Sequence, residues 1–203
     1  MTVRIKEETI RRKASKGQAG EGTEYVDLKQ VKIQFTPMPK NAAELKAIDR
    51  TGDNGRFVTA ALLIAAYKTW TPQNEDTCAE MMKALMNSPV SPDTFTNHTK
   101  QFVKDRMLQN GKWQCIADAY CDGATPENNY RPSSPVTITL REYPYLPQKS
   151  TMTGKELLVE KIVSDFAGAD TERSVSVYKD PTDGRWYLFS DSCRNLLGDI
   201  KGI

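Results

Sequence analysis

The sequence predicts an α+β fold, with N-terminal helices packed on a C-terminal antiparallel sheet. The first observation behind this prediction is apolar spacing typical of helices between residues 55 and 110. The second is strand-like alternation, which dominates between residues 136 and 189. The third is the turn sequence Pro181-Thr182-Asp183-Gly184, which predicts a hairpin and therefore antiparallel neighbours.

The first half of the chain contains one predicted strand and a buried helix. Residues 25–35 alternate at their end and predict a short strand. A short helix is expected over AAELKAIDR, at residues 42–50. Residues 55–70 are apolar on nearly all sides, which predicts a central buried helix rather than a helix on the surface.

Two further helices are predicted from capping signals. Thr71-Pro72 fits an N-cap followed by proline, and the helix after it carries one apolar stripe, formed by Cys78, Met81, Met82 and Leu85. This stripe indicates core packing rather than a cofactor or peptide groove. Ser91-Pro92-Asp93 repeats the signal before a helix whose apolar side is formed by Phe95, Phe102, Val103 and Met107.

The second half is dominated by strands. Four are predicted, over residues 136–140, 157–163, 174–178 and 185–189, and a short helix bearing Leu196, Leu197 and Ile200 follows them. In the last strand Trp186 and Leu188 alternate with Tyr187 and Phe189, so both faces are large and apolar. Burial on both sides is the favoured interpretation, and a dimer contact through this strand is the competing one.

The charge distribution divides the chain into a tail and a domain. Residues 1–20 hold six basic and two acidic residues, and a glycine-rich stretch follows. We therefore expect residues 1–24 to be a flexible basic tail and residues 25–203 to be a single α+β domain. The total length of 203 residues suits one domain of this kind.

The composition restricts the partners and the location. A net charge of +2 is too balanced to favour nucleic acid, except through the basic tail 1–20, which lacks aromatic residues for base stacking. The N-terminus has no apolar signal segment, and no apolar run is long enough to cross a membrane. We therefore expect a cytoplasmic protein without membrane contact.

Cysteine and histidine usage argues against a metal site. The four cysteines form no C-x-x-C pair, and His98 is the single histidine. No metal or cofactor is therefore predicted. The cysteines are expected to be reduced and buried, and His98 is expected on the surface or half-buried.

Two resemblances accompany these patterns. The element order broadly looks like the cone-shaped α+β roll of nuclear-transport-factor-2-like and cystatin-like domains, in which a curved sheet wraps helices and can leave a pocket. Four stretches are also familiar together: KQFVKDRMLQNGKW (100–113), GATPENNYRPSSPVTITL (123–140), AGADTERSVSV (167–177), and GRWYLF with LLGDI (184–189 and 196–200).

These stretches, in this order, resemble an uncharacterised bacterial family classed as a domain of unknown function. Its members share a GATP-x-N-x-Y-x-PS-x-P-type segment, a GAD-x-x-R-type segment, and a closing aromatic strand followed by a Leu-Leu-x-x-Ile tail. Glu172 stands where that family pattern leads us to expect proline. The resemblance covers residues 55–200 and implies membership without an activity.

The loop GATPENNYRPSSP, residues 123–135, is the main candidate site. Its glycine, prolines and asparagines are explained by the backbone geometry of an ordered crossover loop. Ligand or partner binding is the functional alternative, and catalysis by a lone carboxylate is the weakest. The loop residues assigned to binding are Glu127, Asn128, Tyr130 and Arg131.

Three residues outside this loop complete the predicted binding set. Asp170 and Arg173 are three apart, which fits a local ion pair or cap, and an arginine kept for an anionic ligand is the functional alternative. Trp186 belongs to the two-sided aromatic strand and is the third candidate. A single pocket containing Tyr130, Arg173 and Trp186 would support a shared site.

The sequence contains no P-loop, no G-x-G-x-x-G, no H-E-x-x-H and no G-x-S-x-G motif. We assign no catalytic residue. The predicted function is a non-enzymatic binding or assembly module that contacts a protein or a small ligand, with homo-oligomers as one form of assembly. The alternative is a small enzyme with a polar pocket on a cone-type α+β fold.

Overall fold

The structure of the chain is a computed structural model. It describes residues 1–13, 25–144, 147–152, 155–164, 168–169, 171–198 and 200. The strands are β1 (Thr2–Lys13), β2 (Tyr25–Thr36), β3 (Thr137–Glu142), β4 (Gln148–Met152), β5 (Lys155–Ser164), β6 (Arg173–Lys179) and β7 (Trp186–Leu188). The α-helices are α1 (Ala42–Lys46), α2 (Gly55–Lys68), α3 (Asp76–Met86) and α4 (Asn97–Leu108). The 3-10 helices are η1 (Gln109–Gln114), η2 (Asp118–Tyr120), η3 (Pro126–Asn128) and η4 (Ser190–Leu197).

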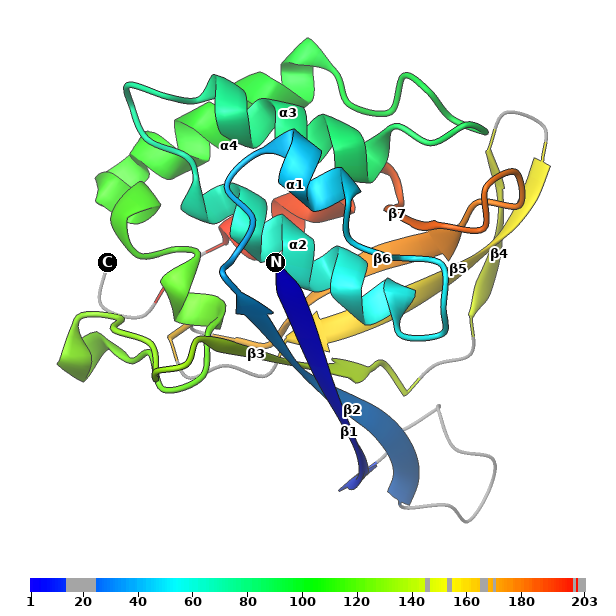
Figure 1. The fold of residues 1–203 in the computed structure, drawn as a ribbon, viewed down its shortest axis with the longest axis horizontal. Coiled ribbons are helices and arrows are strands. Elements are labelled where there is room, and N and C mark those ends of the chain that lie inside the picture. The colour runs from blue at the N-terminus through cyan, green and yellow to red at the C-terminus, as the bar shows by residue number, and fades with distance from the viewer. Residues whose placement is uncertain are drawn as a thin grey trace.

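The strands form one antiparallel sheet in the order β1-β2-β3-β5-β6-β7, and β4 also pairs with β5. The helices α1 to α4 lie together on one face of this sheet (Figure 1). The predicted α+β class, with helices on one side of an antiparallel sheet, is confirmed. Within the described residues β1 and β7 do not pair with each other, so the sheet is open.

The core lies between the sheet and α2. From Gly55 to Tyr67, all but one residue of α2 is buried, as its apolar sequence predicts. Along each strand, alternate side chains face this core. The buried ones include Val31, Ile33, Ile138, Leu140, Val175, Val177, Trp186 and Leu188. The predicted stripe of α3, formed by Cys78, Met81, Met82 and Leu85, belongs to the same core. The prediction that these residues are core is confirmed.

A second, smaller apolar cluster lies outside this core. It consists of Val90, Leu157, Val159, Tyr178 and Tyr187, with Phe189 packed against it. Because Tyr187 alternates with Trp186 and Leu188 along β7, this strand is buried on both faces. The predicted two-sided burial of the last strand is confirmed.

The prediction of a flexible tail is wrong for Thr2–Lys13. These residues form β1, which pairs with β2 along its whole length, from Thr2 opposite Thr36 to Lys13 opposite Tyr25. The physical reason is the neighbouring strand: β1 is mostly exposed and charged, so its own pattern is weak, and its backbone is satisfied by β2. The end of the hairpin extends away from the helices (Figure 1). Residues 14–24 lie outside the described residues.

Two helix starts and one strand also differ from the predictions. Thr71 and Ser91 lie in short turns, closed by bridges to Asn74 and Ser88, so α3 begins at Asp76 and α4 at Asn97. Proline after threonine or serine is as favourable in a turn as at a helix start, which explains the error. The strand β4 was not predicted, because its sequence QKSTM has no apolar alternation.

Several smaller predictions are confirmed. Gly184 has φ +70°, the left-handed backbone expected in the turn before β7. All four cysteines are free and buried. His98 is exposed at the start of α4. Every helix in the described part of the chain is too short or too polar to cross a bilayer.

Candidate functional site

The candidate site is built around Arg50, in the segment between α1 and α2. The Arg50 carbonyl accepts a hydrogen bond from the Trp186 amide at 3.0 Å, so this segment lies along the edge strand β7. Gly55 makes the close approach possible: a Cβ there would lie 2.3 Å from the Arg50 carbonyl oxygen and 2.6 Å from the Trp186 ring. The backbone position of Arg50 is therefore set by β7 and by the first turn of α2.

The guanidinium of Arg50 is buried, with the residue only 1% exposed. Its Nη1 donates to the Trp186 carbonyl at 3.2 Å, and its Nη2 donates to the Ala84 carbonyl near the end of α3 at 3.4 Å. The guanidinium carbon lies 5.0 Å from the centre of the Tyr187 ring. Nε has no hydrogen-bond partner among the described residues, and Arg50 forms no ion pair with any described carboxylate.

This environment leaves a buried positive charge without an anionic partner. Burial lowers the pKa of Arg50, while the nearby Tyr187 and Asp183 act to raise it. An arginine nevertheless stays protonated in proteins, so the charge persists at neutral pH. Carbonyl dipoles and an aromatic face compensate part of the cost of burying it, and an anion would compensate much more.

Arg50 lies at one wall of a pocket of about 340 Å³. The charged residues that line this pocket are Lys46, Arg50, Glu80, Lys83 and Arg185. We call this cavity the Arg50 pocket. Four basic side chains face one acidic side chain there, and Lys46 and Lys83 are exposed, so their ammonium groups are accessible to a ligand.

The two other carboxylates close to this site already have partners. Asp183 accepts the Tyr187 hydroxyl at 2.7 Å and the Arg185 amide at 3.0 Å. Burial, together with this bond to Asp183, raises the pKa of Tyr187 to about 12, so its hydroxyl remains a donor. Asp49 accepts the amide and the hydroxyl of Thr51 at 2.9 and 2.7 Å. These bonds leave both carboxylates negative, but the four basic side chains still outnumber Glu80, Asp183 and Asp49, so a small excess of positive charge remains.

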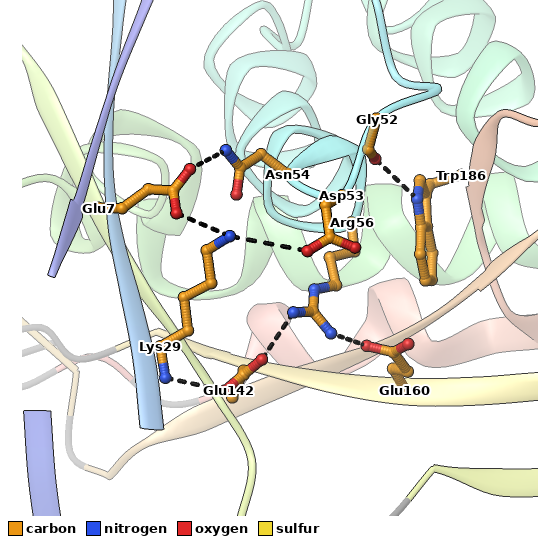
Figure 2. A network of polar contacts seen from close by, with 9 residues as sticks. All are labelled: Glu7, Lys29, Gly52, Asp53, Asn54, Arg56, Glu142, Glu160 and Trp186. Carbon is orange, nitrogen blue, oxygen red and sulfur yellow. Dashed lines mark hydrogen bonds and ion pairs between the residues drawn. The ribbon is translucent and has the colours of Figure 1, made fainter. Parts of the chain in front are cut away.

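The environment of Arg56, at the start of α2, shows the opposite arrangement. Figure 2 shows its guanidinium between two carboxylates, with Nη2 at 2.6 Å from Glu142 and Nη1 on Glu160. Burial acts to lower the pKa of Arg56, but Glu160 and Glu142 outweigh it and raise the pKa. The charge of Arg56 is thus balanced by two carboxylates, although its Nε, like that of Arg50, has no hydrogen-bond partner among the described residues.

The remaining contacts of Figure 2 connect the hairpin to α2. Lys29 on β2 pairs with Glu7 on β1 at 2.9 Å and approaches Asp53 at 3.8 Å, and Asn54 donates to Glu7 at 2.6 Å. Trp186 donates from Nε1 to the Gly52 carbonyl at 3.1 Å. We interpret this network as the structural connection between the sheet and the N-terminus of α2.

The structure places the predicted binding residues in separate environments. Trp186 is buried against Gly55 and Gly52. Arg173 is half-buried at the start of β6, and its guanidinium lies against Gly198. Asp170 lies outside the described residues. No described pocket contains both Tyr130 and either Arg173 or Trp186.

The four loop residues do lie together, in and after η3. Asn128 holds the loop: its side chain accepts the amides of Thr125 and Arg131, and donates to the carbonyls of Gly123 and Arg131. Glu127 and Arg131 are exposed, and Tyr130 is buried. The loop is therefore an ordered crossover, as its composition predicts, and Tyr130 lines a separate cavity beside it.

Sequence reasoning missed every basic residue of the Arg50 pocket. Lys46 and Arg50 lie around α1, Lys83 lies on α3, and Arg185 precedes β7. Each is an ordinary charged residue in its own segment. The sequence suggests an anion-binding arginine only at Arg173. Nothing in the local sequence distinguishes Arg50, because its segment meets those of Lys83 and Arg185 only in the folded chain.

Comparisons with known proteins identify a family and no named relative. A family model described as Domain of unknown function (DUF6935) matches residues 37–203. No curated protein matches the chain, and no solved structure does. The matched range contains all four α-helices and the lining residues of the Arg50 pocket, while β1 and β2 lie before it.

Proposed function

We propose that this chain, which belongs to the family described as Domain of unknown function (DUF6935), is a binding module for a small anionic ligand. The family description names no activity, so the proposal rests on the residues of the chain itself. The ligand group is a phosphate or a carboxylate, and it binds in the Arg50 pocket. The proposal includes a bacterial, cytoplasmic protein, in keeping with the motif resemblance and with four free cysteines.

The observation that carries this proposal is the unpaired charge of Arg50. A buried guanidinium normally has a carboxylate partner, because an unpaired buried charge is costly. Arg50 has carbonyl oxygens and a ring face instead, and its neighbours Lys46, Lys83 and Arg185 are also cationic. An anion in this pocket would meet several cations without displacing an internal carboxylate.

The size and shape of the pocket favour a small ligand. A volume of about 340 Å³ is near the lower end of the range for small-molecule sites. Lys46 and Lys83 are mobile point charges that suit phosphate, while Arg185 offers a planar donor set that suits either anion. Arg50 supplies fixed positive potential from the buried wall.

Thermal unfolding with added ligand tests the proposal. We expect inorganic phosphate or citrate to raise the Tm of the protein by about 5–10 °C when present at about one hundred times its Kd. The double variant Lys46→Gln with Lys83→Gln should lose most of this shift. Titration calorimetry on the same proteins gives the Kd and shows which of the two anions binds more tightly.

Two controls keep this experiment specific. Phosphate stabilises folded proteins in general, so sodium chloride at equal ionic strength is the reference. A matched double variant, Lys13→Gln with Lys40→Gln, removes the same charge from exposed lysines outside the pocket. Equal Tm shifts in the parent and both double variants would contradict the proposal, and so would binding of acidic peptides without binding of either small anion.

A further inference from the structure

A second cavity lies beside the 123–135 loop and shares no lining residue with the Arg50 pocket. Its volume is about 680 Å³, and it opens to solvent between η1 and the segment that follows η3. Asn110, Gln114 and Cys115 line it from the η1 side, and Pro126, Asn129 and Tyr130 line it from the loop side. We call this cavity the Tyr130 pocket. None of its lining residues is charged.

The hydroxyl of Tyr130 has no partner in this environment. The residue is only 7% exposed, and its Oη is buried without a hydrogen bond to any described residue. A buried hydroxyl without a partner typically costs about 1–3 kcal/mol. Burial, with contributions from Cys115 and Glu127, raises the pKa of Tyr130, so the hydroxyl keeps its proton at neutral pH.

Three carboxamides around the same pocket are also without protein partners. Asn110, Gln114 and Asn129 are exposed, and they make no side-chain hydrogen bond with the part of the chain that the structure describes. Asn128, next in the chain, is the contrast, because its carboxamide makes four hydrogen bonds inside the loop. Asn128 thus holds the loop, while the neighbouring Asn129 lines the cavity with a carboxamide that has no protein partner among the described residues.

The backbone presents these side chains at a cost. Asn110, Asn129 and Tyr130 have φ of 53°, 55° and 55°, in the left-handed region. Asparagine tolerates this conformation, but for tyrosine it is an outlier. The Tyr130 amide is held by the Thr125 carbonyl at 2.8 Å, so the conformation is maintained by hydrogen bonding within the loop. This geometry explains how consecutive residues Asn129 and Tyr130 both line one cavity.

We propose that the Tyr130 pocket binds a neutral ligand rich in hydroxyl groups, of the carbohydrate class. Each sugar hydroxyl both donates and accepts, and each carboxamide offers one acceptor and two donor hydrogens, so the two chemistries match. The uncharged walls give no advantage to an ion. A volume of about 680 Å³ accommodates one or two sugar rings.

The same features favour a sugar over a peptide segment. Peptide binding by an extended segment requires either an exposed sheet edge or apolar recesses for alternate side chains. The Tyr130 pocket is formed by 3-10 turns and loop residues, and its apolar lining consists of Pro126 with the largely buried Cys115 and Tyr130. Polar amide groups therefore dominate the surface that a ligand would touch.

Ligand-observed NMR with defined saccharides tests this inference. The probes are glucose, N-acetylglucosamine and maltose, with a capped neutral dipeptide, acetyl-Gly-Gly-amide, as the competing class. We expect saturable binding of at least one saccharide at millimolar or lower concentration. The double variant Asn110→Gly with Asn129→Gly keeps the left-handed backbone, removes two carboxamides, and should weaken binding about tenfold or more.

Tyr130→Phe probes the buried hydroxyl separately from the carboxamides. Because this hydroxyl has no partner in the described part of the chain and is not accessible from the open pocket, its removal should leave the Tm of the unliganded protein unchanged or slightly raised and should leave saccharide binding in place. Asn97→Ala is the matched control for the Asn110/Asn129 variant. Asn97 is an exposed asparagine outside the pocket, and its side chain makes no hydrogen bond with the described residues.

The outcomes that would overturn the inference are specific. They are no saccharide binding by the intact chain, saccharide affinity equal in the parent and the Asn110/Asn129 variant, or binding of the dipeptide alone. The Lys46/Lys83 variant should bind saccharide normally. Loss of anion binding and loss of saccharide binding therefore report on the two pockets separately.

Discussion

Arg50 and Arg56 stand six residues apart in the chain, and their surroundings lead to opposite conclusions. Arg56 lies between Glu142 and Glu160, so its charge is balanced inside the protein. Arg50 is more deeply buried and has only carbonyls and the Tyr187 ring. Because Arg50 and Arg56 are the same residue type, their different interpretations depend only on the groups that surround each guanidinium.

Asp180 is a buried acid whose role is structural. It is fully buried after β6, and its carboxylate accepts the amides of Val90 and Thr182 at 2.8 and 2.7 Å. Burial acts to raise the pKa of Asp180, but hydrogen bonds from Ser88, Val90 and Thr182 outweigh it and lower the pKa. Asp180 therefore stabilises the fold above its unfolded-state pKa, and this contribution is lost as the pH falls through the folded value.

The corresponding prediction concerns Asp180→Asn. We expect it to lower the free energy of unfolding by about 1.5–3 kcal/mol at pH 7, because one charged acceptor is replaced by an amide that cannot accept both bonds equally well. The difference from the parent should shrink as the pH falls below about 4, because the unfolded-state carboxylate is protonated there and the folded-state carboxylate follows at lower pH. Urea unfolding at pH 7 and pH 3 measures both values, with the exposed Asp93→Asn as control. A difference that does not change with pH would contradict this role.

At the scale of elements, α2 is the centre of the fold, and its first turn connects most of the others. Its apolar length packs on the sheet, while the residues at its start contact β1, β2, β3 and β5 through the polar network of Figure 2. The same segment positions Arg50 along β7. The start of α2 therefore links the hairpin, the sheet centre and the candidate site.

Removing Arg56 should weaken this connection. We expect Arg56→Met to lower the free energy of unfolding by about 1–3 kcal/mol, less than for a fully buried pair because the three side chains are 14–29% exposed. Arg56→Lys should lower the free energy of unfolding less than Arg56→Met, because lysine keeps the charge. It should still be less stable than the parent, because lysine cannot bridge two carboxylates in a plane. A double-mutant cycle with Glu160→Gln in urea measures the coupling. A coupling near zero would show that the network does not stabilise the fold.

At the scale of the whole molecule, the long hairpin is part of the sheet. β1 covers one edge of β2 along twelve residue pairs, and β2 contributes Val31, Ile33 and Phe35 to the core. The exposed edge of β1 carries Arg4 and Lys6, a charge pattern that discourages edge-to-edge association. β1 thus protects a strand that the core depends on.

Deleting residues 1–13 should therefore do more than remove a basic tail. We expect the Tm to fall by about 5–10 °C and aggregation to increase, because the edge of β2 would be exposed. Differential scanning calorimetry and size-exclusion chromatography measure these effects. A truncated protein with unchanged Tm and monomeric behaviour would instead support a dispensable tail.

The predictions that held depend on local patterns. The stripe of Met81 and Leu85, the all-round apolar α2, and the two-sided strand around Trp186 were recognised because burial repeats at the period of the element itself. β1 and β4 were missed, since their residues are mostly polar and become strands through a paired neighbour. The turns at Thr71 and Ser91 were misassigned because capping and turn signals use the same residues.

The sequence by itself determined the α+β class, the apolar core segments and the ordered crossover loop 123–135, because each depends on neighbours close in the chain. Only the tertiary structure decided that β1 belongs to the sheet and that Arg50 meets Lys83 and Arg185 around one pocket. The tertiary structure also brought Asn110 opposite Tyr130. Hydrogen-bond pairing and charge convergence join segments that are distant in sequence, and no local pattern records which segments will meet.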